Sequence, residues 1–238
     1  MGKRVVIATP SLAGPTAPYM ESLKACVEPL RAEGYEIRSE QSVGCPYISE
    51  ARAKLLRKAL DWHADRIVFV DYDISWNPQD IITLLSIETE VVAGTYRFKD
   101  EDERYMGVLF DGPNNRPVQR QDGCIKAICA PAGFLMVTPK AIDRFIQKYP
   151  ELCYGARYAP TVDLFNHGAY ENAWWGEDYA FCRRFRKAGG EVYIYPDLDL
   201  THHDGEKSYP GNFHTFLRKQ PGGDLSAEYL ASIHKSAA

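Results

Sequence analysis

A short apolar strand that ends in two carboxylates constrains the fold of this chain more than any other feature. After its first residue the run Arg66–Val70 is apolar and rich in β-branched side chains, which is typical of a strand buried on both faces of a parallel sheet. The run stops abruptly at Asp71-Tyr72-Asp73. Because open α/β sheets bind ligands at the carboxyl ends of their strands, the sequence predicts a polar site at this position.

The acidic pair itself suggests what could bind there. Asp71 and Asp73 are separated by one residue, and such a pair suits a hard divalent cation that takes few protein oxygens and completes its shell with phosphates. The same pair is also compatible with a simple turn or a helix cap, so the motif needs support from the rest of the chain.

The first half of the chain alternates between strand and helix patterns. Segments with apolar residues at spacings of three and four predict helices, and short apolar runs predict strands. This order favours an α/β fold with a doubly wound, mostly parallel sheet. The expected strands are Val5–Ala8, Tyr35–Ser39, Arg66–Val70 and Glu90–Gly94, and the expected helices are Tyr19–Ala32, Ile48–His63 and Pro78–Ile87.

The second half has a more irregular texture. The segment Tyr149–His167 is rich in Tyr, Pro and Gly, and we expect it to form a loop over a site. The other expected elements are an antiparallel pair, Tyr105–Phe110 and Cys124–Cys129, around a turn at Asp111–Pro113, then a strand at Gly133–Val137, a helix at Pro139–Lys148, a helix at Glu177–Ala188 and a strand at Glu191–Tyr195.

Composition excludes several classes of protein. The net charge of −4 argues against a protein with a broadly basic surface for binding nucleic acid. No window approaches the 18 or so apolar residues of a membrane span, and the apolar run near the N-terminus is too short for a signal peptide. The six cysteines show no CxxC spacing, which favours reduced thiols in a cytoplasmic protein, of the cell or of a virus host, over zinc ligands or a disulfide scaffold.

Four features follow one another in a fixed order along the chain. They are the strand end at Thr9-Pro10-Ser11, Arg52 near a helix start, the Asp71-x-Asp73 pair, and Gly176-Glu177-Asp178 followed by His202-His203-x-Gly205. This order resembles GT-A glycosyltransferases, especially the small family 2-like enzymes of bacteria, phages and large DNA viruses. The resemblance extends over roughly residues 4 to 216, and no GxGxxG fingerprint of a dinucleotide fold is present.

The resemblance implies a fold and a domain plan. It implies a mostly parallel GT-A sheet flanked by helices, with a small antiparallel sheet on the acceptor side. We expect one catalytic domain over residues 1–238, with a nucleotide-binding half at about 1–98, an acceptor-binding half at about 99–216 and a C-terminal tail at 217–238.

The resemblance also implies a metal-dependent transfer from a nucleoside diphosphate sugar, with a UDP-sugar as the favoured donor and Mn²⁺ or Mg²⁺ as cofactor. Asp73 would be the direct metal ligand, and Asp71 would share the metal or hold the ribose. His203 is the expected third ligand because His203-Asp204-Gly205 matches the family's HxG pattern, whereas His202 is the alternative. The expected contacts to the nucleotide sugar are Thr9, Pro10, Ser11, Arg52, Asp71, Tyr72 and Gly133.

On the acceptor side, the helix start at Glu177-Asp178 carries the acid–base expectation. An inverting transferase needs one carboxylate that takes the proton of the acceptor hydroxyl. The resemblance assigns this role to Asp178 and an orienting role to Glu177, although two acids at a helix start also suit the helix dipole. Trp174 and Trp175 could stack on an acceptor ring or belong to the core.

Two other function classes remain open at this point. A haloacid-dehalogenase-like phosphotransferase would use Asp71 as its nucleophile, but its acidic strand normally lies near the N-terminus. A non-catalytic sugar-nucleotide-binding module would need neither a metal site nor a base. The acceptor is expected to be a glycan, and a modified DNA base is less favoured because the chain is net acidic.

Overall fold

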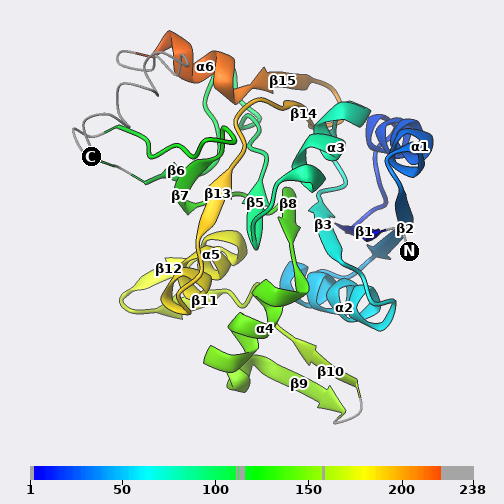
Figure 1. The fold of residues 1–238 in the computed structure, drawn as a ribbon, viewed down its shortest axis with the longest axis vertical. Helices are drawn as coiled ribbons and strands as arrows, with labels where there is room; N and C mark the ends of the chain where they lie inside the picture. Colours follow the sequence, from blue (N-terminus) through cyan, green and yellow to red (C-terminus); the bar gives the residue numbers. More distant parts are fainter. Residues whose placement is uncertain (1–2, 111, 113–115, 157–158, 221–238) are drawn as a thin grey trace.

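An eight-stranded sheet with helices on both faces forms the body of the molecule (Figure 1). The computed structural model describes residues 3–110, 112, 116–156 and 159–220. The strand order is β2-β1-β3-β8-β5-β13-β7-β6. These strands are β1 (Lys3–Ser11), β2 (Tyr35–Val43), β3 (Arg66–Val70), β5 (Val91–Ala93), β6 (Val108–Leu109), β7 (Ile125–Cys129), β8 (Phe134–Val137) and β13 (Val192–Ile194).

Most strands of this sheet run in one direction, which confirms the mostly parallel α/β fold expected from the sequence. β1 is parallel to β2 and β3, and β13 is parallel to β5. β8 runs the opposite way between β3 and β5 and pairs with both. The predicted antiparallel pairing near Tyr105–Phe110 and Cys124–Cys129 is present as β6 and β7, whereas Asp111 and Pro113 of the expected turn lie outside the described residues.

The helices divide between the two faces of the sheet because the strand side chains alternate. In β1, Val5 and Ile7 pack with α1 and α3, while Val6 and Ala8 pack with α2, α4 and α5 on the other face. The helices are α1 (Ala17–Ala32), α2 (Ile48–Asp61), α3 (Pro78–Ser86), α4 (Pro139–Lys148), α5 (Glu177–Lys187) and α6 (Phe213–Lys219).

Small antiparallel sheets accompany the main sheet, where the sequence predicted one such sheet. One of them places β14 (Asp199–His203) between β15 (Ser208–Asn212) and β4 (Ile74–Ser75). Since β4 follows directly on the acidic pair at the end of β3, this sheet brings the C-terminal histidines to the carboxyl end of the main sheet. The others are the hairpin β9 (Cys153–Ala156) with β10 (Ala159–Val162) and the hairpin β11 (Gly168–Tyr170) with β12 (Ala173–Trp175).

The expectation of a loop over the site at residues 149–167 is wrong. The segment forms a short 3₁₀ helix, η2 (Pro150–Leu152), and then the strand pair β9–β10, which lies beyond α4 at the foot of the molecule (Figure 1). β10 contacts α2, and Leu164 and Phe165 are buried in the core. Strand pairing and apolar burial therefore hold this segment under the sheet instead of over the site. None of the helices in the described part of the chain combines the length and the apolarity that a membrane span requires.

Candidate active site

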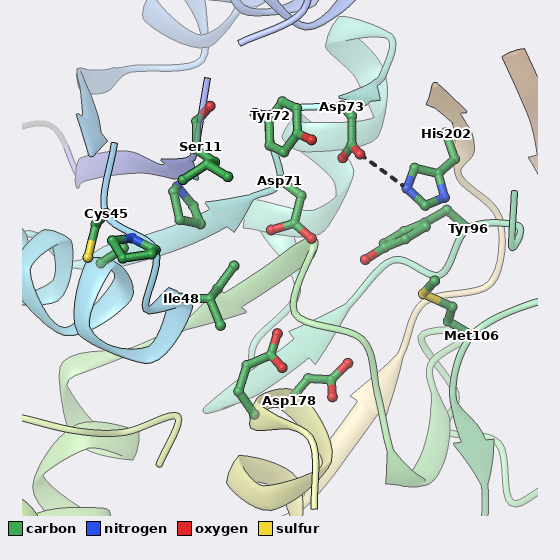
Figure 2. A pocket seen from close by; sticks show the side chains of 15 residues that line it. Ser11, Cys45, Ile48, Asp71, Tyr72, Asp73, Tyr96, Met106, Asp178 and His202 are labelled. Carbon is green, nitrogen blue, oxygen red and sulfur yellow. Dashed lines mark ion pairs between the residues drawn. The ribbon is translucent and has the colours of Figure 1, made fainter. Parts of the chain in front are cut away.

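A cleft of about 320 Å³ opens where β1 and β3 end. Figure 2 shows Asp71 at its centre, Asp178 across the cleft, and Asp73 with His202 on one side. The opposite wall is mainly apolar and comes from Leu12, Pro46, Ile48 and their neighbours. This volume lies in the range of small-molecule sites. The cleft therefore combines an apolar wall with a strongly acidic floor.

The strand end and a glycine place the first carboxylate. The backbone N–H of Asp71 donates to the carbonyl of Gly133 at 2.9 Å, which joins the end of β3 to the start of β8. A Cβ at Gly133 would lie 2.0 Å from the Tyr96 hydroxyl and 2.7 Å from Asp71 Oδ2. Only glycine fits here. The Tyr96 hydroxyl and the Asp71 carboxylate therefore lie directly against the Gly133 backbone. The expected contact of Gly133 with the nucleotide sugar stays a prediction.

Arg52 joins the two acidic motifs that lie far apart in the sequence. Its guanidinium donates to Asp71 Oδ1 and to Glu177 Oε1, each at 2.8 Å, and its side chain is 1% exposed. The ring of Phe165 covers the guanidinium carbon at 5.0 Å. Despite its burial, the two carboxylates raise the pKa of Arg52. The sequence predicted a contact from Arg52 to the nucleotide, whereas in the structure its two terminal nitrogens bind carboxylates and hold the site together.

Replacing Arg52 by Met is therefore expected to destabilise the fold by about 3 kcal/mol or more, because it leaves two partly buried carboxylates unpaired. Urea unfolding followed by circular dichroism measures this change. Arg31→Met is the matched control, since Arg31 pairs with Glu28 on an exposed helix surface, and its expected cost is below about 0.5 kcal/mol. Equal costs for the two variants would contradict the role given to Arg52.

Strand alternation decides which histidine faces the acidic pair. His202 pairs with Ile74 in the β14–β4 ladder, and the N–H of His203 donates to the carbonyl of Asp73 at 2.9 Å. The ring of His202 turns toward the cleft and places its Nε2 3.6 Å from Asp73 Oδ2 (Figure 2). The sequence predicted that the His203 ring faces the two aspartates, and this prediction is wrong. The His203 ring lies on the other side of the strand and contacts Ser75 Oγ at 2.8 Å and Ser208 Oγ at 2.9 Å.

The hydrogen bond on the far side of the His202 ring fixes its tautomer. Nδ1 lies 2.9 Å from the carbonyl oxygen of Arg97, and a carbonyl only accepts, so Nδ1 carries the proton. In the neutral ring Nε2 then points its lone pair toward a carboxylate oxygen of Asp73. Two electron-rich atoms facing each other need a proton or a cation between them. An imidazole held in this way by a backbone carbonyl is the usual arrangement of a metal-binding histidine.

Lys99 is a site residue that the sequence did not reveal. Its Nζ lies 2.5 Å from Asp73 Oδ2. Burial alone would raise the pKa of Asp73, but the interactions with His202 and Lys99 outweigh it and leave that pKa below its ordinary value. Lys99 belongs to a run of charged residues, 99–104, that is typical of a solvated loop, so the sequence carries no signal for this contact. In the described part of the chain, no group of three or more His, Cys, Asp or Glu side chains is arranged so that it could hold a metal ion by itself.

The two acids at the start of α5 have different surroundings. Glu177 is engaged by Arg52, whereas Asp178 forms no ion pair among the described residues and accepts only from the N–H of Tyr179, at 2.7 Å. Burial, reinforced by the charge of Glu177, raises the pKa of Asp178 to about 6. A helix N-terminus by itself would lower the pKa of a carboxylate. Burial in the cleft therefore dominates and leaves Asp178 as a carboxylate with an unusual proton affinity.

The remaining predicted contacts divide into those in the cleft and those outside it. Pro10, Ser11 and Tyr72 line the cleft. Thr9 does not, because it shares the strand face of Val5 and Ile7 and its hydroxyl is bonded to that of Tyr19.

The tryptophan pair lies on the β11–β12 hairpin, away from the cleft lining. Trp174 is 73% exposed. Trp175 stacks on Tyr170, and the guanidinium of Arg183 lies 4.4 Å from its ring centre. β12 leads directly into α5, which carries Asp178. The expected contact of the two tryptophans with an acceptor stays a prediction.

Comparisons with known proteins identify the fold. No family model matches this chain, and no curated protein matches it. Among solved structures, A197 from STIV has a TM-score of 0.50 and 15% identity, over 88% of this chain and 94% of that chain. At this identity the likeness shows the fold alone.

Two further solved structures are similar at lower scores. One is a glycosyltransferase involved in the glycosylation of the major capsid of PBCV-1, with a TM-score of 0.34 and 14% identity over 59% of this chain and 62% of that chain. The other is a mutant Drosophila β1,4-galactosyltransferase 7 in complex with manganese, UDP-Gal and xylobiose, with a TM-score of 0.41 and 12% identity over 96% and 79% of the two chains. The chain has a mixed α/β fold with a mostly parallel central sheet, as the sequence predicted, and this fold is similar to that of A197 from STIV.

Proposed function

We propose that this chain is a metal-dependent glycosyltransferase that moves a sugar from a nucleoside diphosphate sugar to an acceptor hydroxyl. One observation carries the proposal. A free carboxylate with a pKa of about 6, Asp178, shares a cleft with the Asp71–Asp73 pair and with the inward-facing Nε2 of His202. A base and a cation site on facing sides of one cleft are what a sugar transfer needs.

The donor set fits a divalent cation. Two carboxylates and a tautomer-fixed imidazole are suitable ligands for Mn²⁺, and the oxygen ligands also suit Mg²⁺. Asp73 and His202 would hold the ion, and Asp71 would complete the set or contact the ribose. When bound, a divalent cation neutralises charge on the departing diphosphate.

The apolar wall and the acidic floor suggest how the substrates would lie. Leu12, Pro46 and Ile48 offer apolar contacts to a nucleobase, and we propose uracil as that base. Asp178 would take the proton of an acceptor hydroxyl as the new glycosidic bond forms. Among the described residues that line the cleft, Asp178 is the one carboxylate without an ion pair, and we therefore propose direct displacement with inversion. We also propose a glycan as the acceptor. The ion pair with Arg52 engages Asp71 Oδ1, and this argues against Asp71 as the nucleophile of a phosphotransferase.

A donor screen tests the proposal directly. The purified protein is incubated with UDP-glucose, UDP-galactose and their N-acetyl forms, with Mn²⁺ or with excess EDTA, and released UDP is measured with and without glycan acceptors. We expect Mn²⁺-dependent release from at least one donor. Binding of UDP without any release from a broad panel would indicate a non-catalytic module, and release of inorganic phosphate would indicate a phosphotransferase.

A further inference from the structure

We propose that Lys99 is a tethered cation that competes with the divalent metal for Asp73, so that the metal binds tightly only together with the nucleotide diphosphate. The inference rests on the metal site of the proposed function and adds an order of binding to it. It gives a role to a lysine that the transfer chemistry does not use.

The geometry places the ammonium at a ligand atom. Lys99 Nζ contacts Asp73 Oδ2 at 2.5 Å, and the Nε2 of His202 faces the same oxygen at 3.6 Å. The side chain of Asp73 is 10% exposed, so little water screens this contact. An ammonium and a divalent cation repel each other strongly at such distances in a poorly screened site. Lys99 must therefore leave Asp73 before a metal ion can take its place.

The loop that carries Lys99 is built against the site. The carbonyl of Arg97 fixes the His202 tautomer, and the N–H of Phe98 donates to the carbonyl of Arg104 at 3.0 Å, which closes the loop on itself. Arg97, which orients His202, thus lies two positions before Lys99, which contacts Asp73. Other charged side chains of this loop pair on the outside, as Glu101 does with Lys207.

The Lys99 side chain can move away from Asp73 when the donor binds. This side chain is 31% exposed, and a four-carbon stem can reorient without moving the backbone. A diphosphate in the cleft offers new negative charge to the released ammonium, while Asp73 becomes free for the metal. Nucleotide and metal should then bind with positive coupling, and such coupling is reciprocal.

Mn²⁺ binding measured by electron paramagnetic resonance tests this without any turnover. Free Mn²⁺ is titrated with and without saturating UDP for the wild type, Lys99→Gln, Lys99→Arg and Lys207→Gln. Without UDP, we expect Lys99→Gln to bind Mn²⁺ about 10-fold more tightly than the wild type, and we expect the coupling between Mn²⁺ and UDP to fall by a similar factor. Lys99→Arg keeps the positive charge and should resemble the wild type. Lys207→Gln loosens the same loop outside the cleft and should change neither value.

The possible outcomes distinguish a failure of the Lys99 inference from a failure of the proposed metal site. Equal Mn²⁺ affinities of the wild type and Lys99→Gln without UDP would overturn the inference, and the metal site would still stand if Asp73→Asn lost Mn²⁺ binding in the presence of UDP. If the wild type and Lys99→Gln both failed to bind Mn²⁺ even with UDP, the metal site of the proposed function would fail and the inference with it.

Discussion

Replacing Asp178 by Asn is expected to lower turnover by about two to four orders of magnitude while UDP binding stays nearly unchanged. The amide keeps the size of the side chain and can still accept from the N–H of Tyr179, but it cannot take a proton from an acceptor hydroxyl. Initial rates of UDP release with the best donor and acceptor measure the effect, and a UDP titration of the same variant measures binding.

The pH dependence of the wild type gives the same prediction a second readout. A base with a pKa of about 6 is active when deprotonated, so kcat/KM should fall about tenfold per pH unit below pH 6 and level off above it. Asp143→Asn is the matched control, because Asp143 is exposed on α4, and it should keep both the rate and the pH profile. A normal rate for Asp178→Asn would mean that this residue serves only the N-terminus of α5. A product with retained anomeric configuration would exclude direct displacement.

Asp73→Asn is expected to abolish Mn²⁺-dependent UDP binding and to lower transfer by about a thousandfold or more, since the charge that holds the metal is lost. The side chain of Asp73 is only 10% exposed, so truncation to Ala would also open a space beside Lys99 and His202. Asn keeps the packing and removes only the charge. Isothermal titration with UDP, in Mn²⁺ and in EDTA, separates the metal-dependent part of binding from the rest.

The histidine pair provides the internal comparison for this prediction. His202→Ala should weaken Mn²⁺ binding at least about tenfold, whereas His203→Ala, which removes a ring bonded to Ser75 and Ser208, should change it by less than about threefold. The reverse order would restore the HxG histidine as the ligand. Wild-type turnover that persists in excess EDTA would count against the metal site as a whole.

Local patterns in the sequence were enough to place most helices and strands. Apolar runs such as Arg66–Val70, and helices with clear start signals such as Pro139–Lys148, have the bounds that were predicted. The antiparallel direction of β8 between β3 and β5 was not foreseen, because a four-residue apolar run carries no information about its neighbours or its direction. The pairing of β9 with β10 is not predicted for a related reason: the Tyr, Pro and Gly content of this segment suggests turns, while its place in the fold depends on the contact of β10 with α2, which comes from a distant part of the chain.

What the sequence by itself determined is the identity of the acidic motifs and their position at element ends, because a strand end and a helix start are local properties. That placed Asp71 and Asp73 after β3 and Asp178 at the start of α5. Only the tertiary structure decided which distant side chains meet them. Consecutive residues of a strand point to opposite faces, so the register of β14 against β4 selects His202 over His203. Ion pairing across more than a hundred residues joins Arg52 to Glu177, and the path of a charged loop brings Lys99 to Asp73.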